Sequence, residues 1–302
     1  MELKGKKILV VGLGKSGLAT AIFLRQQGAQ VTVSDVRSAE ALAEELPALL
    51  DAGVMVEAGG HGLLTFRRQD LIVVSPGVPL STPELAQARA FGTPVIGELE
   101  LASRFLKGNI LAITGSNGKT TTTALCGDIF RTGEQTVQVG GNIGVPVIAL
   151  IPESREQGWS VLEVSSFQLE TVETFHPRIA VILNITPDHL DRHGTMENYI
   201  AAKQRIFANQ TAEDFLVLNA EDPETQQAAA RAPGKVYWFS GTRPVRQGTF
   251  VYQDAIVWRP SEQAALEPVV PVGEITSYCA LRFASGVVLP RCAAAFTASW
   301  AI

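Results

Sequence analysis

The hydrophobic positions of this chain form short continuous runs that alternate with longer stretches of mixed apolar and polar residues. In the first third, the runs are rich in Val and Ile, have the length of strands and end at glycine or polar residues. They predict strands at 7–12, 30–35, 54–57, 70–75 and 94–96. The stretches between them predict helices at 15–28, 39–51 and 82–91. This alternation is typical of a parallel sheet covered by helices on both faces.

A second region of the same kind follows residue 97. A helix at 98–108 leads into an apolar strand at 109–114, and a later helix is expected at 197–208. Further strands are predicted at 136–139, 160–164, 179–184 and 215–218. Short segments between 235 and 272 are separated by Gly, Pro and Asp, which favours antiparallel edge strands at 236–239, 249–252 and 255–258. We therefore expect one α/β domain at 1–97 and a second at 98–274.

The last stretch, 275–302, has a different composition. It contains no Asp, Glu, Lys, Asn or Gln, and it holds two of the three cysteines, Cys279 and Cys292. Neither helical nor strand periodicity persists in it. We interpret it as an aberrant tail, frameshifted or otherwise non-native.

Composition and charge narrow the class of protein. The net charge is −5 and no basic run occurs, which argues against a nucleic-acid partner. The cysteines, including Cys126, lack metal or disulfide spacing, as expected in a reducing compartment. No signal-peptide core or membrane-spanning run is present. A cytoplasmic monomer without membrane attachment is the expectation.

Residues 111–123 carry the most specific chemistry. A strand runs into a glycine turn and then into a lysine and hydroxyls at a helix start, an arrangement that suits a nucleoside triphosphate. The loop is a short G-x-x-G-K-T form, because Ile113 occupies the place of the first glycine in the longer G-x-x-x-x-G-K-[ST] pattern. The predicted ATP-binding residues are Gly115, Ser116, Asn117, Gly118, Lys119, Thr120 and Thr121. The alternative is a glycine turn capped by Thr and Asn without a ligand. With this loop, the second domain is predicted to be a P-loop-type α/β ATPase domain with a few antiparallel edge strands.

A second glycine loop, Gly12-Leu-Gly-Lys-Ser-Gly17, follows the first strand and opens a helix. Asp35 closes the next strand, which completes a Rossmann-like pattern for a nucleotide diphosphate. NAD is the obvious ligand, and a packed glycine turn without a ligand is the alternative. Ser75-Pro76-Gly77 ends another strand at the edge where ligands bind in open α/β sheets, although an ordinary turn would have the same sequence.

Candidate metal and substrate residues lie in the second domain. Glu163 ends a strand and suits a hard cation such as Mg²⁺. Asp188-His189-Leu-Asp191-Arg-His193 follows the next strand, and solvated loop residues are the alternative for Asp191 and His193. Lys203 lies on an amphipathic helix, where a solvated lysine is the default interpretation. Asn142 lies in a glycine turn and could simply adopt a left-handed conformation.

Together these segments resemble the Mur ligase family of peptidoglycan synthesis, and within it the member that adds D-glutamate. The resemblance runs from about residue 5 to about 274, with the motifs in family order. It rests on Thr-Gly-Ser-Asn-Gly-Lys-Thr at 114–120, Glu-Val-Ser-Ser-Phe-Gln-Leu-Glu at 163–170, Asn-Ile-Thr-Pro-Asp-His-Leu-Asp-Arg-His at 184–193, Ala-Ala-Lys-Gln-Arg-Ile at 201–206, and the first glycine loop.

The resemblance implies an ATP-dependent ligase that joins D-glutamate to UDP-N-acetylmuramoyl-L-alanine through an acyl phosphate. It implies that the first glycine loop holds the UDP substrate rather than NAD. The implied substrate contacts are Lys15, Ser16, Asp35, Arg37, Ser75, Pro76, Gly77, Asn142, Gln168 and His189. The implied catalytic residues are Lys119, Glu163, His189 and Lys203, and the implied Mg²⁺ ligands are Thr120, Glu163, His189 and Lys203, the lysine as a carbamate.

The chain also departs from the family pattern. The family continues into a third domain that begins near a Gly-x-His-Asn segment, whereas the last histidine here is His193. We therefore expect a chain that lacks the C-terminal ligase domain. A non-catalytic protein that binds UDP-substrate and ATP is one alternative. A NAD-dependent oxidoreductase is the other, and it leaves the second glycine loop unexplained.

Overall fold

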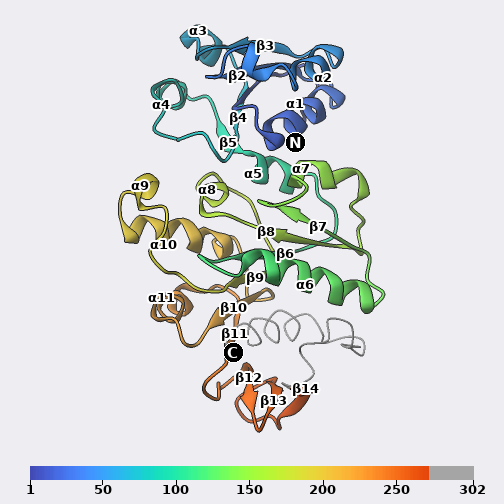
Figure 1. Ribbon diagram of the computed structural model, residues 1–302, viewed down its shortest axis with the longest axis vertical. Coiled ribbons are helices and arrows are strands. Elements are labelled where there is room, and N and C mark those ends of the chain that lie inside the picture. Colours follow the sequence, from blue (N-terminus) through green and yellow to red (C-terminus); the bar gives the residue numbers. More distant parts are fainter. Residues whose placement is uncertain (272–302) are drawn as a thin grey trace. The chain divides into compact units, whose positions relative to one another are not determined.

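The computed structural model describes residues 1–271, which form two compact units (Figure 1). Unit 1 contains Met1–Leu106, Gly144–Pro152 and Glu170–Phe175. Unit 2 contains Lys107–Ile143, Glu153–Leu169 and the chain from His176 to the end of the described residues. The sequence places the domain boundary at 97/98, and this boundary stays a prediction. The expected aberrant tail lies outside the described residues.

Unit 1 is built on a five-stranded, wholly parallel sheet with the order β3-β2-β1-β4-β5 (Figure 1). The strands are β1 (Lys7–Val11), β2 (Gln30–Asp35), β3 (Met55–Ala58), β4 (Leu71–Val74) and β5 (Val95–Gly97). The helices are α1 (Lys15–Gln26), η1 (Glu40–Leu42), α2 (Leu46–Asp51), α3 (Leu63–Arg67), α4 (Pro83–Ala90), α5 (Glu98–Ser103) and α7 (Val147–Leu150), followed by η2 (Ile151–Glu153). The parallel α/β architecture predicted for this region is confirmed.

One predicted helix of unit 1 is wrong in extent. The stretch 39–51 is not continuous, because the short turn η1 and the helix α2 are separate elements. Pro47 lies in the first turn of α2, where its missing N–H costs nothing, whereas inside a continuous helix over 39–51 it would remove a backbone hydrogen bond and its ring would clash with the preceding turn. A helix therefore restarts at Leu46 instead of running through.

Unit 2 has a nine-stranded sheet with the order β14-β13-β12-β11-β10-β9-β6-β8-β7 (Figure 1). Its strands are β6 (Asn109–Thr114), β7 (Val137–Gly141), β8 (Trp159–Glu163), β9 (Ile179–Ile182), β10 (Phe215–Asn219), β11 (Lys235–Ser240), β12 (Gly248–Tyr252), β13 (Ala255–Arg259) and β14 (Glu267–Pro271). Its helices are α6 (Lys119–Thr132), α8 (Ser166–Leu169), α9 (Leu190–His193), α10 (Met196–Gln204), η3 (Arg205–Phe207), α11 (Pro223–Ala228) and η4 (Ala229–Arg231). All pairs from β7 to β12 are parallel.

The expected antiparallel pairing is right only for the last strands. The strand β11 pairs parallel with both β10 and β12, so the prediction for 236–239 is wrong. The chain passes from β10 through α11 before β11, and such a crossover returns it in the same direction. Between β12 and β13, Gln253 and Asp254 both have positive φ (47° and 59°), as in a two-residue hairpin turn. This turn makes β12 and β13 antiparallel.

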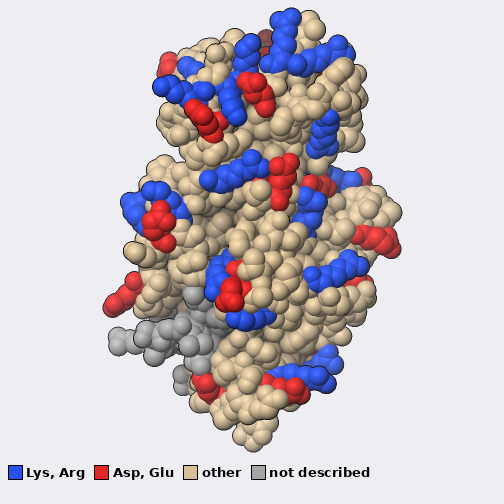
Figure 2. Space-filling view, turned by 180° about the vertical axis from the view of Figure 1, so that it is seen from behind, with Lys and Arg blue, Asp and Glu red and all other residues tan. Residues whose placement is uncertain are grey.

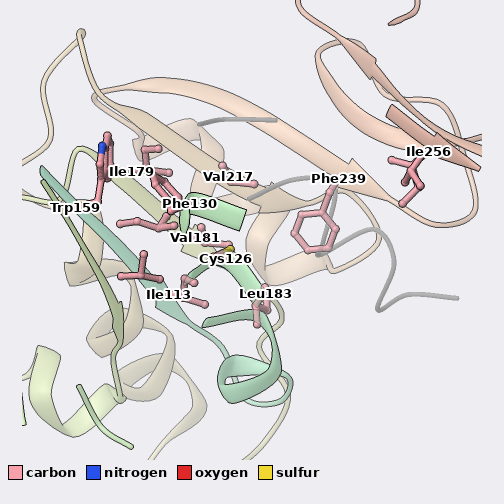
Figure 3. Packing of buried hydrophobic residues seen from close by; sticks show 13 residues of the cluster. Ile113, Cys126, Phe130, Trp159, Ile179, Val181, Leu183, Val217, Phe239 and Ile256 are labelled. Carbon is pink, nitrogen blue, oxygen red and sulfur yellow. The ribbon is translucent and has the colours of Figure 1, made fainter. Parts of the chain in front are cut away.

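The core of unit 2 explains why its central strands read as continuous apolar runs. Leu111 and Ile113 of β6 lie beside Val181 of β9, and all three are fully buried. Phe130 of α6 packs on Trp159 of β8 with ring centroids 5.1 Å apart (Figure 3). Strands buried on both faces have no polar face to interrupt the pattern.

Two buried carboxylates on α5 organise part of unit 1. Glu98 accepts the N–H of Ile148 at 2.7 Å, and burial raises the pKa of Glu98 to about 7. Glu100 accepts the N–H groups of Glu173, Thr174 and Phe175 at 2.7–3.1 Å. Each carboxylate thus binds backbone from one of the two later segments that belong to this unit.

None of the helices within residues 1–271 has the length and apolar character needed to cross a membrane.

Glu100→Ala is expected to lower the free energy of unfolding by about 3 kcal/mol, because it leaves several buried N–H groups without an acceptor. Glu173→Ala is the matched control: it removes an exposed partner of Arg104 but keeps the Glu173 N–H, and should cost no more than about 0.5 kcal/mol. Urea unfolding followed by far-ultraviolet circular dichroism measures both. Equal losses in the two variants would contradict the role given to Glu100.

Candidate active site

The phosphate loop connects β6 to α6 at the carboxyl edge of the second sheet. Gly118 caps α6 with φ 81°, a left-handed conformation that glycine adopts without strain. The helix that follows is 14 residues long. The N–H groups of its first turn have no partner within the helix and carry the positive end of its dipole, which makes this end suitable for an anion.

The Lys119 side chain points back toward the residues that precede α6 in this loop. Its Nζ donates hydrogen bonds to the carbonyl oxygens of Gly115 and Ser116, both at 2.9 Å. The positive charge is therefore next to the first turn of α6, where phosphate oxygens would be the stronger acceptors.

Glu163 joins three elements at the same edge. It ends β8 and is 2% exposed. Its Oε2 accepts a hydrogen bond from Thr120 Oγ1 at 2.9 Å, and its Oε1 accepts one from Asn142 Nδ2 at 3.2 Å. A hydroxyl and a carboxylate side by side are hard oxygen donors, as a Mg²⁺ site requires. The three residues singled out from the sequence are thus brought together.

Lys203 is buried, contrary to the default interpretation of a solvated helix lysine. It is 2% exposed, and its Nζ donates to Gly115 O at 2.7 Å and lies 4.6 Å from the centre of the Tyr199 ring. Burial lowers the pKa of Lys203 to about 7, and the charge of Lys119 acts in the same direction. A partly neutral, sheltered amine is the form that takes up CO₂ as a carbamate.

His189 is not joined to these residues by any contact that the described part of the chain shows. It has φ 52°, its ring packs on Phe167 at 4.9 Å, and its Nε2 lies 3.4 Å from Asp188. Within residues 1–271 there is also no group of three or more His, Cys, Asp and Glu side chains that could hold a metal ion. A metal site here would need Thr120 and Lys203 beside Glu163, and the role of His189 stays a prediction.

Gln168 is almost fully buried, and part of its hydrogen-bonding capacity is used locally. Its Oε1 accepts from the N–H of Ser165 at 3.0 Å and from Ser165 Oγ at 3.1 Å. His193, for which a solvated loop was the alternative, is buried as well: its Nε2 lies 2.9 Å from Ser166 Oγ, and its ring stacks on Phe167 at 5.4 Å.

Asn184 and Tyr199 are among the residues that contact the phosphate loop and were not singled out from the sequence. Asn184 accepts hydrogen bonds from the N–H groups of Ser116 and Asn117, at 3.1 and 2.9 Å. The Tyr199 hydroxyl lies 3.0 Å from Ser116 Oγ. The signals for Asn184 in the sequence are its position at the end of the strand predicted at 179–184 and at the start of the motif at 184–193.

The first glycine loop, in unit 1, is tightly packed. A Cβ at position 17 would lie 1.9 Å from Gly12 O, so only glycine fits there. Asp35 Oδ2 accepts the Leu13 N–H at 2.6 Å, and its Oδ1 accepts Arg37 Nε at 3.2 Å. Burial alone would raise the pKa of Asp35, but the bonds from Arg37 and Leu13 outweigh it and lower this pKa below its usual value.

The remaining candidate residues of unit 1 differ in exposure. Ser75 is buried, and its Oγ donates a hydrogen bond to Gly12 O at 2.8 Å, which stabilises the first glycine loop. Lys15 and Gly77 are exposed, and Ser16 and Pro76 are half-buried. The loop thus offers the backbone of Gly14–Ser16 and the start of the 12-residue helix α1 to a ligand.

Comparison with known proteins identifies the class that this fold and site define. Residues 6–97 match the N-terminal domain of Mur ligases of the MurD-like type, and residues 113–255 match the Mur ligase middle domain. The chain therefore belongs to the Mur ligase family.

Two relatives of high sequence identity share one name. The chain is 70% identical over 275 residues to a UDP-N-acetylmuramoylalanine–D-glutamate ligase of Acidobacterium capsulatum, covering 91% of this chain and 60% of the relative. It is 57% identical over 270 residues to the ligase of the same name from Koribacter versatilis, covering 89% and 60%. The chain thus spans about 60% of the length of these relatives.

Solved structures agree on the fold. A UDP-N-acetylmuramate:L-alanyl-γ-D-glutamyl-meso-diaminopimelate ligase from Neisseria meningitides superposes with a TM-score of 0.57 at 17% identity, covering 88% of this chain and 86% of that one. A murein peptide ligase from Psychrobacter arcticus superposes with a TM-score of 0.53 at 16% identity, covering 98% and 68%.

The Lys203 amine is expected to titrate near pH 7, well below an ordinary lysine. ¹³C NMR of protein labelled at lysine Cε, in CO₂-depleted buffer and with Lys203→Arg to assign the signal, measures this. Lys119→Met should raise the pKa of Lys203, since it removes a nearby positive charge, whereas Lys107→Met, at the opposite edge of the sheet, should not. A Lys203 pKa near 10.5 in the unsubstituted protein would contradict the buried position.

Proposed function

We propose that this chain carries the UDP-substrate-binding and ATP-binding parts of an ATP-dependent ligase that joins D-glutamate to UDP-N-acetylmuramoyl-L-alanine. The observation that carries the proposal is the junction of Thr120, Glu163 and Asn142 beside a phosphate loop whose Gly115 carbonyl binds Lys203. The names of the relatives supply the substrate class.

The mechanism follows from the charges that must be controlled. A substrate carboxylate attacks the γ-phosphate of ATP and ADP leaves, which gives an acyl phosphate; the amine of D-glutamate then displaces phosphate and forms the amide. Two anions must approach each other in the first step, so positive groups at the phosphates lower the barrier. Lys119 and the first turn of α6 supply such groups from this chain. Mg²⁺, when bound, adds positive charge at the phosphates, and Thr120, Glu163 and a carbamylated Lys203 would hold it.

In unit 1, the proposed ligand is the UDP part of the substrate. The start of α1 suits a diphosphate, and Asp35 with Arg37 lies at the end of the neighbouring strand, where a ribose or base would follow. Both matched family models are Mur ligase models, so NAD, the other candidate for this loop, has no finding in its favour.

We also propose a cytoplasmic monomer that binds no nucleic acid. On the face shown in Figure 2, Lys and Arg side chains lie among Asp and Glu side chains rather than in a continuous basic surface. Cys126, the cysteine within the described residues, is a free, buried thiol, which suits a reducing compartment.

Nucleotide binding tests the ATP part of the proposal. Isothermal titration with ADP and Mg²⁺ should give saturable binding, and Lys119→Met should weaken it about 10-fold or more, because a charge-assisted hydrogen bond to phosphate is lost. Lys107→Met is the charge-matched control and should bind ADP as the unsubstituted chain does. Equal ADP affinity in the Lys119 variant and the control would contradict the role of the loop.

Release of phosphate in the presence of ATP, UDP-N-acetylmuramoyl-L-alanine and D-glutamate tests the ligase reaction. Release that requires all three compounds is the expected result for a chain competent in ligation. Binding of ADP and UDP-substrate without phosphate release would instead support the non-catalytic alternative.

A further inference from the structure

Asn184 makes more bonds to the phosphate loop than any residue predicted from the sequence. It follows β9, which lies next to β6 in the sheet. Its side-chain Oδ1 accepts from the N–H groups of Ser116 (3.1 Å) and Asn117 (2.9 Å), and its Nδ2 donates to Asn117 O at 3.2 Å. Its backbone carbonyl also accepts the Ser116 N–H at 2.9 Å.

The same segment holds the Ser116 side chain. Ser116 Oγ donates a hydrogen bond to Thr186 O at 2.9 Å and accepts one from the Thr186 N–H at 3.0 Å. It also lies 3.0 Å from the Tyr199 hydroxyl. The middle of the loop is therefore bound to residues 184–186 through backbone and side chain alike. Within the described residues, Asn184 makes no bond to Gly118 or to the start of α6, so the backbone N–H groups there are left for a ligand.

We infer that Asn184 is a positioning residue that holds the phosphate loop in the conformation that binds nucleotide. Its bonds to Ser116 and Asn117 direct phosphate to the first turn of α6 and to Lys119. This inference rests on the proposed binding of ATP. Because the Ser116 and Asn117 N–H groups already donate to Asn184, the donors left for phosphate are the N–H groups at positions 118–121 and the Lys119 amine. Holding the loop before binding reduces the conformational entropy that nucleotide binding would otherwise cost.

The residue type matters because an amide has both a donor and an acceptor. Alanine would remove both, leaving the Asn117 N–H and C=O without their partner and Ser116 N–H with only the backbone bond. Aspartate would keep the acceptor but would place a negative charge against Asn117 O and beside the phosphates. The alanine variant therefore tests the effect of a less ordered phosphate loop on nucleotide binding, and the aspartate variant tests the effect of an added negative charge.

Asn219 provides a matched control. It ends the neighbouring strand β10, its Nδ2 donates to Leu183 O at 3.0 Å, and its Oδ1 accepts the Glu221 N–H at 2.8 Å. It thus makes the same kinds of bonds at the same sheet edge without any described bond to the phosphate loop.

The experiment measures three quantities in the full chain and in Asn184→Ala, Asn184→Asp and Asn219→Ala. They are the Kd for ADP with Mg²⁺, the Kd for UDP, and hydrogen exchange at the Ser116 and Asn117 amides. For Asn184→Ala we expect an ADP Kd raised about 10-fold, exchange of the Asn117 amide accelerated about 10-fold, and an unchanged UDP Kd. Exchange of the Ser116 amide should change less, because this N–H keeps its bond to the backbone carbonyl of residue 184. Asn219→Ala should keep both Kd values and the exchange rates.

Asn184→Asp keeps the inference testable if the alanine variant does not fold. Its exchange should stay slow, because the acceptor remains, while its ADP Kd should rise about 10-fold because of the added charge. Faster exchange without weaker ADP binding in Asn184→Ala, weaker binding without faster exchange, or no change in either would overturn the inference. Wild-type ADP affinity in Asn184→Asp would also overturn it. Failure of the unsubstituted chain to bind ADP would overturn the proposed function itself, and with it this inference.

Discussion

The candidate site depends on one turn, in which the chain leaves β6, passes through a left-handed glycine at 118 and starts α6. A helix start has backbone donors without partners, and this one lies at the carboxyl end of β6, within the parallel part of the second sheet. The neighbouring strands β8 and β9 end at the same edge. Glu163 and Asn184 therefore reach the turn from opposite sides of β6. Thr120 and Asn142 bond to Glu163, and Lys203 bonds to the Gly115 carbonyl of the same loop.

Burial determines the chemistry available at this turn. Glu163 and Lys203 are each 2% exposed, so their charges are not screened as surface charges are. Burial lowers the pKa of Lys203, and the charge of Lys119, which donates to the same Gly115 carbonyl, acts in the same direction. A phosphate at the start of α6 would offer Lys119 a stronger acceptor than a carbonyl. The occupancy of the loop and the environment of Lys203 are thus physically linked.

Much of this arrangement could be predicted from the sequence, because local patterns determine it. The parallel strands follow from continuous apolar runs, and the loop follows from Gly115, Gly118 and Lys119 in a fixed spacing. The burial of Lys203 could not be read from its helix, since amphipathic spacing does not show what packs over a side chain. The role of Asn184 was missed for the same reason: it depends on β9 lying beside β6, which is a tertiary fact. The parallel direction of β11 likewise depends on the crossover through α11 rather than on the composition of the strand.

The central claim is that nucleotide phosphates lie at the start of α6, next to Lys203. Paramagnetic broadening by Mn²⁺ bound with ADP tests this most directly, because the effect falls steeply with distance from the ion. In protein labelled with ¹³C at lysine Cε, the account predicts that Mn²⁺ and ADP together broaden the signals of Lys119 and Lys203. The signal of Lys235, which begins β11 at the opposite edge of the sheet, should remain sharp. Sharp Lys119 and Lys203 signals at saturating Mn²⁺ and ADP would contradict the account.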